Sequence, residues 1–112
     1  MMMGGKRLTP IDPKVKADAL AELLPGFIRR RKEDILVLHE AAGANDFARV
    51  AEVAHKIRGN GATFGFPELS EIAERLELAA KKGEEPLMRR EIEQLEKRVG
   101  EIDAKIAPPA GS

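Results

Sequence analysis

The residue with the clearest chemical potential is His55, within the segment DFARVAEVAHKIRGNGATFG at positions 46–65. On an ideal helix of about 100° per residue, Val53, Ile57 and Phe64 lie roughly 160–200° away from His55. This spacing predicts an apolar face turned toward a core, with His55 on the opposite, solvent-facing side. An ordinary surface histidine among weak helix formers is the other interpretation of the same pattern.

Small residues surround His55 on the predicted exposed face. Ala51, Gly59 and Ala62 are its helical neighbours. A glycine inside a helix costs roughly 1 kcal/mol relative to alanine, and no core contact requires Gly59 on this side. We therefore predict that Ala51, Gly59 and Ala62 form a surface on which another macromolecule can approach the ring. Gly61 points toward the buried side, where close packing of a neighbouring helix explains it.

An exposed imidazole can act as a nucleophile toward a phosphoryl group brought by a partner. Its Nε2 attacks while Nδ1 keeps a proton, and a carboxylate that accepts from Nδ1–H fixes that tautomer. A nearby cation offsets the charge of the phosphoryl oxygens. Arg58, one helical turn from His55, is the candidate cation. Glu77, at the edge of the apolar stripe of the next helix, is the candidate carboxylate.

The composition excludes several other classes of function. The 112 residues suit one domain, contain no Cys, and balance 19 basic against 19 acidic side chains. The absence of Cys excludes disulfides and thiolate sites. A neutral chain whose only aromatic residues are four Phe is unsuited to nucleic acid. No apolar run is long enough to span a membrane, and no signal peptide is visible. We expect a soluble cytoplasmic protein.

Helical periodicity extends along most of the chain, and no segment alternates like a strand. We predict an all-α, antiparallel up-and-down four-helix bundle (25–42, 46–64, 67–82, 85–106) with a short additional N-terminal helix (12–23) ending before Pro25-Gly26. The bundle is expected to span 11–107, with flexible ends at 1–10 and 108–112. Asp12 and either Asn45 or Asp46 are expected to cap helices, and Gly43 and Gly65 to end them.

Two features of these helices leave alternatives open. The last helix carries apolar residues at alternating spacings of four and three, which fits either a core within the chain or a coiled-coil dimer. Because three heptads are marginal for a coiled coil, a core within the chain is favoured. The run Arg29–Lys32 is interpreted as a solvated face, with a docking patch for an acidic partner as the alternative.

The segment Ala54-His55-Lys56-Ile57-Arg58-Gly59, followed by Thr63-Phe64-Gly65-Phe66, Leu69 and Leu76-Glu77, resembles the histidine-containing phosphotransfer (HPt) motif. It is especially similar to the HPt domain of chemotaxis-type histidine kinases. The resemblance implies that His55 is the phosphoacceptor and that Glu77 bonds its ring. It also implies that Gly59 lets a partner close over the ring and that Gly65 ends the helix. Arg58 stands where the family usually has Lys, which keeps the charge but changes its shape.

What the resemblance implies is a phosphorelay intermediate rather than an autonomous enzyme. A receiver-domain phospho-aspartate or a histidine kinase would deliver the phosphoryl group to His55, and a response-regulator receiver domain would take it. The chain shows no nucleotide-binding motif and no metal-ligand spacing, so we expect no cofactor of its own, and Mg²⁺ only in the partner. The resemblance also implies a monomer.

Two rival interpretations remain. One is a bundle that binds a receiver domain as a decoy or scaffold without accepting phosphate, although such a protein has no need of the His55, Arg58 and Glu77 set. The other is a domain excised from a larger chemotaxis-type kinase. The Met1 start and the short Pro-Ala-Gly-Ser tail favour a free-standing protein.

Overall fold

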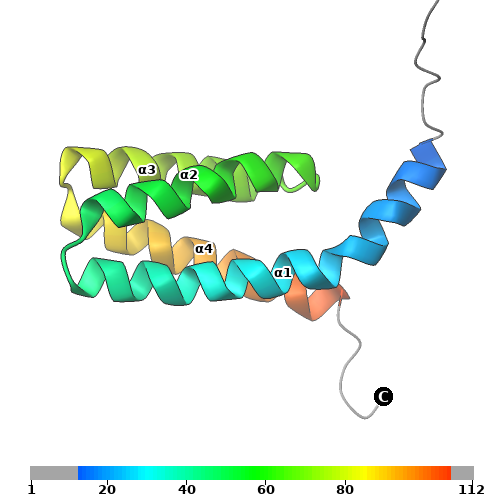
Figure 1. Ribbon diagram of the computed structural model, residues 1–112, viewed down its shortest axis with the longest axis horizontal. Helices are drawn as coiled ribbons and strands as arrows, with labels where there is room; N and C mark the ends of the chain where they lie inside the picture. The colour runs from blue at the N-terminus through cyan, green and yellow to red at the C-terminus, as the bar shows by residue number, and fades with distance from the viewer. Residues whose placement is uncertain (1–12, 107–112) are drawn as a thin grey trace, which may run out of the picture.

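The computed structural model describes the backbone of residues 13–106 and the side chains of residues 21–106. This part of the chain forms four helices, α1 (Pro13–Gly43), α2 (Phe47–Thr63), α3 (Pro67–Lys82) and α4 (Glu85–Ile106), and contains no strand. Short turns reverse the chain between them, so the predicted all-α four-helix bundle is confirmed (Figure 1). None of these helices has the length and apolar character needed to cross a membrane.

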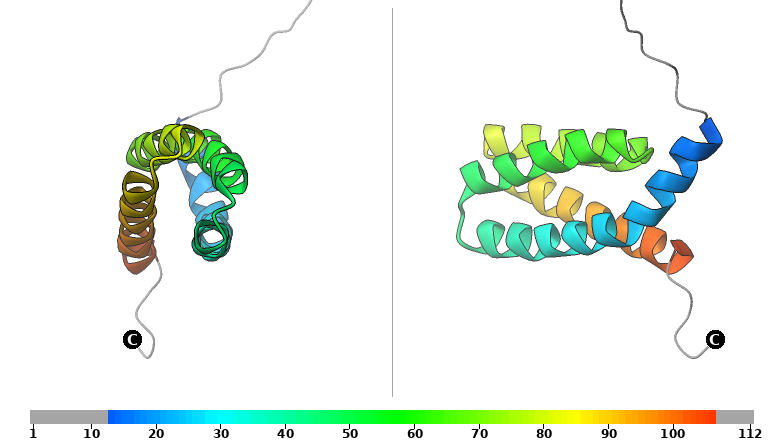
Figure 2. Two further views of the ribbon diagram at one scale, coloured as in Figure 1. Left: turned by 90° about the vertical axis from the view of Figure 1, so that its left-hand side faces the viewer. Right: turned by 45° about the vertical axis from the view of Figure 1, so that its right-hand side comes forward.

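The helices are arranged as two pairs. Each helix packs against two neighbours, in the order α1–α2, α2–α3, α3–α4 and α4–α1. The end-on view in Figure 2 shows α2 and α3 side by side above, with α1 and α4 below them. The α2–α3 pair has the most extensive contact, and this pair carries the residues predicted to do chemistry.

The prediction of a separate helix over 12–23 was wrong, because α1 continues through Pro25 as one helix. Proline lacks the N–H that would bond to the carbonyl of Ala21, and its ring crowds that carbonyl, so it bends a helix without always ending it. Figure 1 shows the bend, before which α1 projects away from the bundle. Leu23, just before the bend, is accordingly exposed. The expected cap at Asp12 and the expected flexible ends, 1–10 and 108–112, lie outside the described residues.

The turns follow the predicted positions with one correction. Gly43 does not adopt a left-handed conformation; Asn45 does instead, with φ of 59°. The helix continues through Gly43, so the reversal falls two residues later, where an asparagine tolerates positive φ. Asp46 caps α2 by accepting a hydrogen bond from the backbone N–H of Arg49 at 3.1 Å. Gly65, with φ of 83°, turns the chain from α2 into α3.

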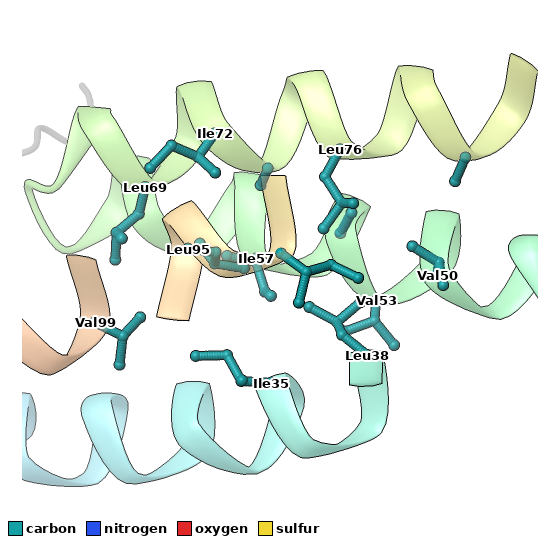
Figure 3. Close-up of a cluster of buried hydrophobic side chains, with 14 of the residues drawn as sticks. Ile35, Leu38, Val50, Val53, Ile57, Leu69, Ile72, Leu76, Leu95 and Val99 are labelled. Atoms are coloured by element: carbon teal, nitrogen blue, oxygen red, sulfur yellow. The ribbon is translucent and has the colours of Figure 1, made fainter. Parts of the chain in front are cut away.

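The core lies between the four helices and is formed by the predicted apolar faces. Figure 3 shows part of it, with Leu38 from α1, Ile57 from α2, Leu76 from α3 and Leu95 from α4 converging. Each fully buried side chain of this size contributes about 1.5–3 kcal/mol. The apolar seam of α4, from Met88 to Ile102, is buried within this chain. The interpretation of the seam as part of an internal core is therefore confirmed.

The basic run Arg29–Lys32 is only partly a solvated face. Arg31 is buried at 4% exposure and its Nε lies 2.9 Å from a carboxylate oxygen of Asp34. Lys32 forms an ion pair with Asp103 of α4. Only the first two arginines of the run are exposed without an ion pair among the described residues. The docking role of the run stays a prediction that concerns those two side chains.

Candidate functional site

His55 lies near the middle of α2 on its solvent-facing side. Its side chain is 65% exposed, whereas Val53 and Ile57 are buried in the core. This is the orientation that the helical spacing predicts. Within residues 21–106, no protein group forms a hydrogen bond with Nε2 of His55. That nitrogen therefore faces solvent and is free to meet a reacting group.

Glu77 of α3 approaches the other ring nitrogen of His55. Its Oε2 lies 3.2 Å from Nδ1 of His55. The sequence placed Glu77 at the edge of an apolar stripe, and the structure buries it more deeply, at 6% exposure. Because α3 runs antiparallel beside α2 after the short turn at Gly65, residues distant in sequence meet at this point. Glu77 is thus a nearly buried carboxylate directed at an exposed imidazole.

Three cationic or basic groups gather around the Glu77 carboxylate. Its Oε2 also lies 3.0 Å from Nζ of Lys81, and its Oε1 lies 3.6 Å from Nη1 of Arg58. Burial raises the pKa of Glu77, but the hydrogen bond from Lys81 and the charges of Lys81, Arg58 and His55 outweigh burial and hold the pKa below the usual value for a glutamate. Glu77 is therefore ionised at neutral pH.

Lys81 is the site residue that sequence reasoning missed. It lies four residues after Glu77 on the same helix, a spacing at which opposite charges commonly pair. That signal was present in the sequence, but it does not distinguish Lys81 from other surface lysines at helical spacing. What distinguishes Lys81 is that its partner is the carboxylate next to His55.

Two groups compete for Nδ1 of His55. Besides Glu77 Oε2, Nη2 of Arg58 lies 3.3 Å from it. The carboxylate can only accept, so its contact requires a proton on Nδ1 and leaves Nε2 with its lone pair. The guanidinium can only donate, so its contact requires a bare Nδ1 and places the proton on Nε2. The balance between Glu77 and Arg58 therefore sets which nitrogen can act as a nucleophile.

Fewer small residues are exposed around the His55 ring than the sequence predicted. Gly59 and Ala62 are exposed, and a Cβ built on Gly59 would meet no atom within 4 Å. Ala51, however, is only 8% exposed. It lies on the side of α2 that packs against α3, where it and Ala80 line the same hollow. Its predicted exposure was wrong, because the small residues of α2 and α3 allow close approach of the two helices.

Gly61 and Ser70 hold α2 and α3 together next to this surface. A Cβ on Gly61 would lie 2.8 Å from Oγ of Ser70 and 3.1 Å from its backbone nitrogen. The Ser70 hydroxyl donates a hydrogen bond of 2.6 Å to the backbone carbonyl of Arg58. The predicted close helix packing at Gly61 is confirmed. Ser70 had no signal in the sequence.

No cluster of His, Asp and Glu side chains among the described residues has the composition and geometry to hold a metal ion. The geometry at His55 instead combines an exposed imidazole, a buried carboxylate and a cation. This combination suits transfer of a phosphoryl group to and from a ring nitrogen.

Comparison with known proteins agrees with this chemistry. The family model described as Hpt domain matches residues 22–105. Comparisons with curated proteins and with solved structures give no match. The matched segment includes the four-helix bundle from just before the bend of α1 almost to the end of α4. The chain therefore belongs to the Hpt domain family, whose members are phosphocarriers in histidine phosphorelay signalling.

Proposed function

We propose that His55 is the phosphoacceptor of this Hpt domain and that Glu77 and Arg58 assist it. His55 receives the phosphoryl group from a receiver-domain phospho-aspartate or a histidine kinase and passes it to a response-regulator receiver domain. The observation that carries this proposal is the imidazole itself, which exposes Nε2 while Nδ1 lies 3.2 Å from a buried carboxylate. A nucleophile with one free nitrogen and one anchored nitrogen is suited to a relay.

In the proposed step, the Nε2 lone pair of His55 attacks phosphorus on the partner's aspartyl phosphate. An N–P bond forms, the P–O bond to the aspartate breaks, and the aspartate leaves as a carboxylate. The ring gains positive charge as the bond forms, and Glu77 offsets that charge through Nδ1–H. Arg58, whose Nη2 lies 3.3 Å from Nδ1, would turn from that nitrogen toward the phosphoryl oxygens on Nε2 and offset their charge. The reverse sequence transfers the group to the next receiver.

The chain acts here as a phosphocarrier and binds no cofactor of its own. Any Mg²⁺ belongs to the receiver or the kinase, because the partner must hold its own phosphorylated carboxylate or nucleotide. The finer resemblance to the HPt domain of chemotaxis-type kinases rests on the Leu76-Glu77 pair and on the Thr63–Phe66 segment. Exposed Gly59 and Ala62 next to His55 are proposed as the place where the receiver docks.

The direct test is phosphoryl transfer in solution. The purified protein is mixed with a panel of phosphorylated receiver domains from the same organism, and labelled phosphate on the protein is followed. We expect label that is labile in acid and stable in base, as for phosphohistidine. Binding to a receiver without any label from any donor would contradict the proposal and favour a decoy or scaffold.

Replacing Glu77 with glutamine is expected to slow phosphoryl acceptance about tenfold, equivalent to roughly 1.4 kcal/mol of barrier. The amide keeps the shape of the side chain but loses the charge that holds the proton on Nδ1. Stopped-flow or rapid-quench transfer from a phosphorylated receiver measures the change. Some transfer remains, because His55 is still present. An unchanged rate would remove Glu77 from the proposed mechanism.

Replacing Gly59 with glutamine is expected to slow transfer while leaving stability equal or slightly higher. The new side chain meets no atom of this protein within 4 Å of its Cβ, and glutamine favours a helix more than glycine does. It would, however, occupy the space beside His55 that a docking receiver needs. Transfer kinetics and thermal unfolding of the same sample test both parts. Unchanged kinetics would mean that the receiver docks elsewhere.

A further inference from the structure

The carboxylate that orients His55 is shared. Oε2 of Glu77 lies 3.2 Å from Nδ1 of His55 and 3.0 Å from Nζ of Lys81. One oxygen thus faces two donors, the imidazole Nδ1–H and the lysine ammonium. The Lys81 ammonium can supply the stronger, charge-assisted hydrogen bond to that oxygen. The bond from the ammonium draws electron density from Oε2 and so weakens this oxygen as an acceptor for His55.

Arg58 is the other partner of Nδ1, and its presence makes the tautomer of His55 depend on the strength of Glu77 as an acceptor. Arg58 Nη2 lies 3.3 Å from Nδ1 and favours the tautomer with a bare Nδ1. The charged groups that face the ring are therefore Arg58 from α2 and Glu77 from α3, with Lys81 acting on Glu77 from the following turn. Weakening Glu77 as an acceptor favours the tautomer in which Nε2 carries the proton and cannot attack.

We propose that Lys81 is a positioning residue that limits the nucleophilic tautomer of His55 by competing for Oε2 of Glu77. The proposal rests on the proposed function for its biological meaning, because it concerns regulation of the same site. Lys81 itself does not touch the imidazole or the reacting atoms. Its side chain is 61% exposed, so it is accessible to acidic groups of a docked partner. If Lys81 moved away from Glu77, Oε2 would accept a stronger hydrogen bond from Nδ1–H of His55.

The test measures the imidazole directly. In protein labelled with ¹⁵N in histidine, the nitrogen chemical shifts of the neutral ring report the ratio of the Nδ1–H to the Nε2–H tautomer. Lys81→Gln is expected to raise this ratio for His55 about twofold to threefold, as expected for a partly exposed charge pair. Lys81→Arg keeps a cation and should return the ratio toward the wild-type value. The signals of His39, which pairs with Glu96 on α4, give a reference within the same spectra.

Two further variants separate this route from general electrostatics. Lys82→Gln removes the neighbouring charge from the same last turn of α3, where no ion pair to Lys82 is present among the described residues, and should leave the ratio unchanged. In a Glu77→Met background, Lys81→Gln should have no effect, because the shared acceptor is gone. No change in the single Lys81→Gln variant, or the same change in both backgrounds, would overturn the proposal.

Phosphoryl transfer provides an independent second measurement. If Lys81 acts as proposed, Lys81→Gln accepts phosphate faster from a phosphorylated receiver, by at most about two to three times, in proportion to the larger fraction of the ring that carries its proton on Nδ1. A tautomer shift in a protein that accepts no phosphate would contradict the proposed function and leave the role of Lys81 standing. Normal phosphate acceptance with an unchanged tautomer ratio would contradict the role of Lys81 alone.

Discussion

Replacing His55 with glutamine is expected to abolish phosphoryl acceptance and to leave the fold intact. The side chain is 65% exposed and faces away from the core, so substitution of a surface residue of this kind changes stability by no more than about 0.5 kcal/mol. Glutamine has no ring nitrogen to attack phosphorus. Loss of acceptance should therefore be complete within detection. Transfer assays and circular dichroism on the same preparation measure both parts.

The second histidine of the chain provides the matched control for this experiment. His39 is also exposed and lies 2.8 Å from Glu96 on α4, away from the α2–α3 pair. The variant His39→Gln should accept phosphate at the wild-type rate. Labelling that survives His55→Gln but disappears in His39→Gln would reassign the phosphoacceptor. Substantial unfolding of His55→Gln would show that the ring is needed for the bundle.

Replacing Gly61 with glutamine is expected to destabilise the protein by about 2–3 kcal/mol, the cost of forcing extra atoms into a packed interface. Its Cβ would lie 2.8 Å from Oγ of Ser70 and 3.2 Å from Cβ of Leu69. The Ser70 hydroxyl is held by its bond to the Arg58 carbonyl, so it cannot easily give way. Thermal unfolding should show a drop of roughly 10 °C or more.

Gly59, two residues earlier on the same helix, makes the comparison specific. The same substitution there meets open space, so the stability of Gly59→Gln should equal or exceed that of the wild type. Opposite effects of one substitution at two glycines of α2 would locate the contact with α3 at Gly61. Equal stability of the two variants would mean that α3 does not approach α2 so closely.

Much of the site could be predicted because it depends on short-range regularities. The spacing of Val53 and Ile57 fixes the direction of His55, and the turn at Gly65 is short enough to return α3 alongside α2. Other features depend on how closely the helices approach, which spacing alone does not give. Ala51 was expected to be exposed but is buried beside α3, and Lys81 pairs with the same Oε2 of Glu77 that faces His55.

Two predictions about α1 were also inaccurate. Pro25 was expected to separate two helices, but a proline removes only one backbone hydrogen bond, and the turns on both sides retain theirs. The buried Arg31 was indistinguishable from its neighbours in a basic run until the position of Asp34 and the core side of the helix were known. The core positions of α1 and α4, by contrast, follow directly from the apolar periodicity of these two helices.

The tight contact between Gly61 and Ser70 has a mechanical consequence for His55. Residues 70 and 77 are two turns apart on one rigid helix, so an axial slip of α3 at Ser70 displaces Glu77 by the same length. A slip of one residue, about 1.5 Å, across the 3.2 Å contact between the carboxylate and the ring would lengthen it to about 3.5 Å, where a hydrogen bond is weak. The contact at Gly61 thus acts as a stop that sets the longitudinal alignment of the two helices. Proton placement on the imidazole is accordingly sensitive to sliding of α3 well before the bundle comes apart.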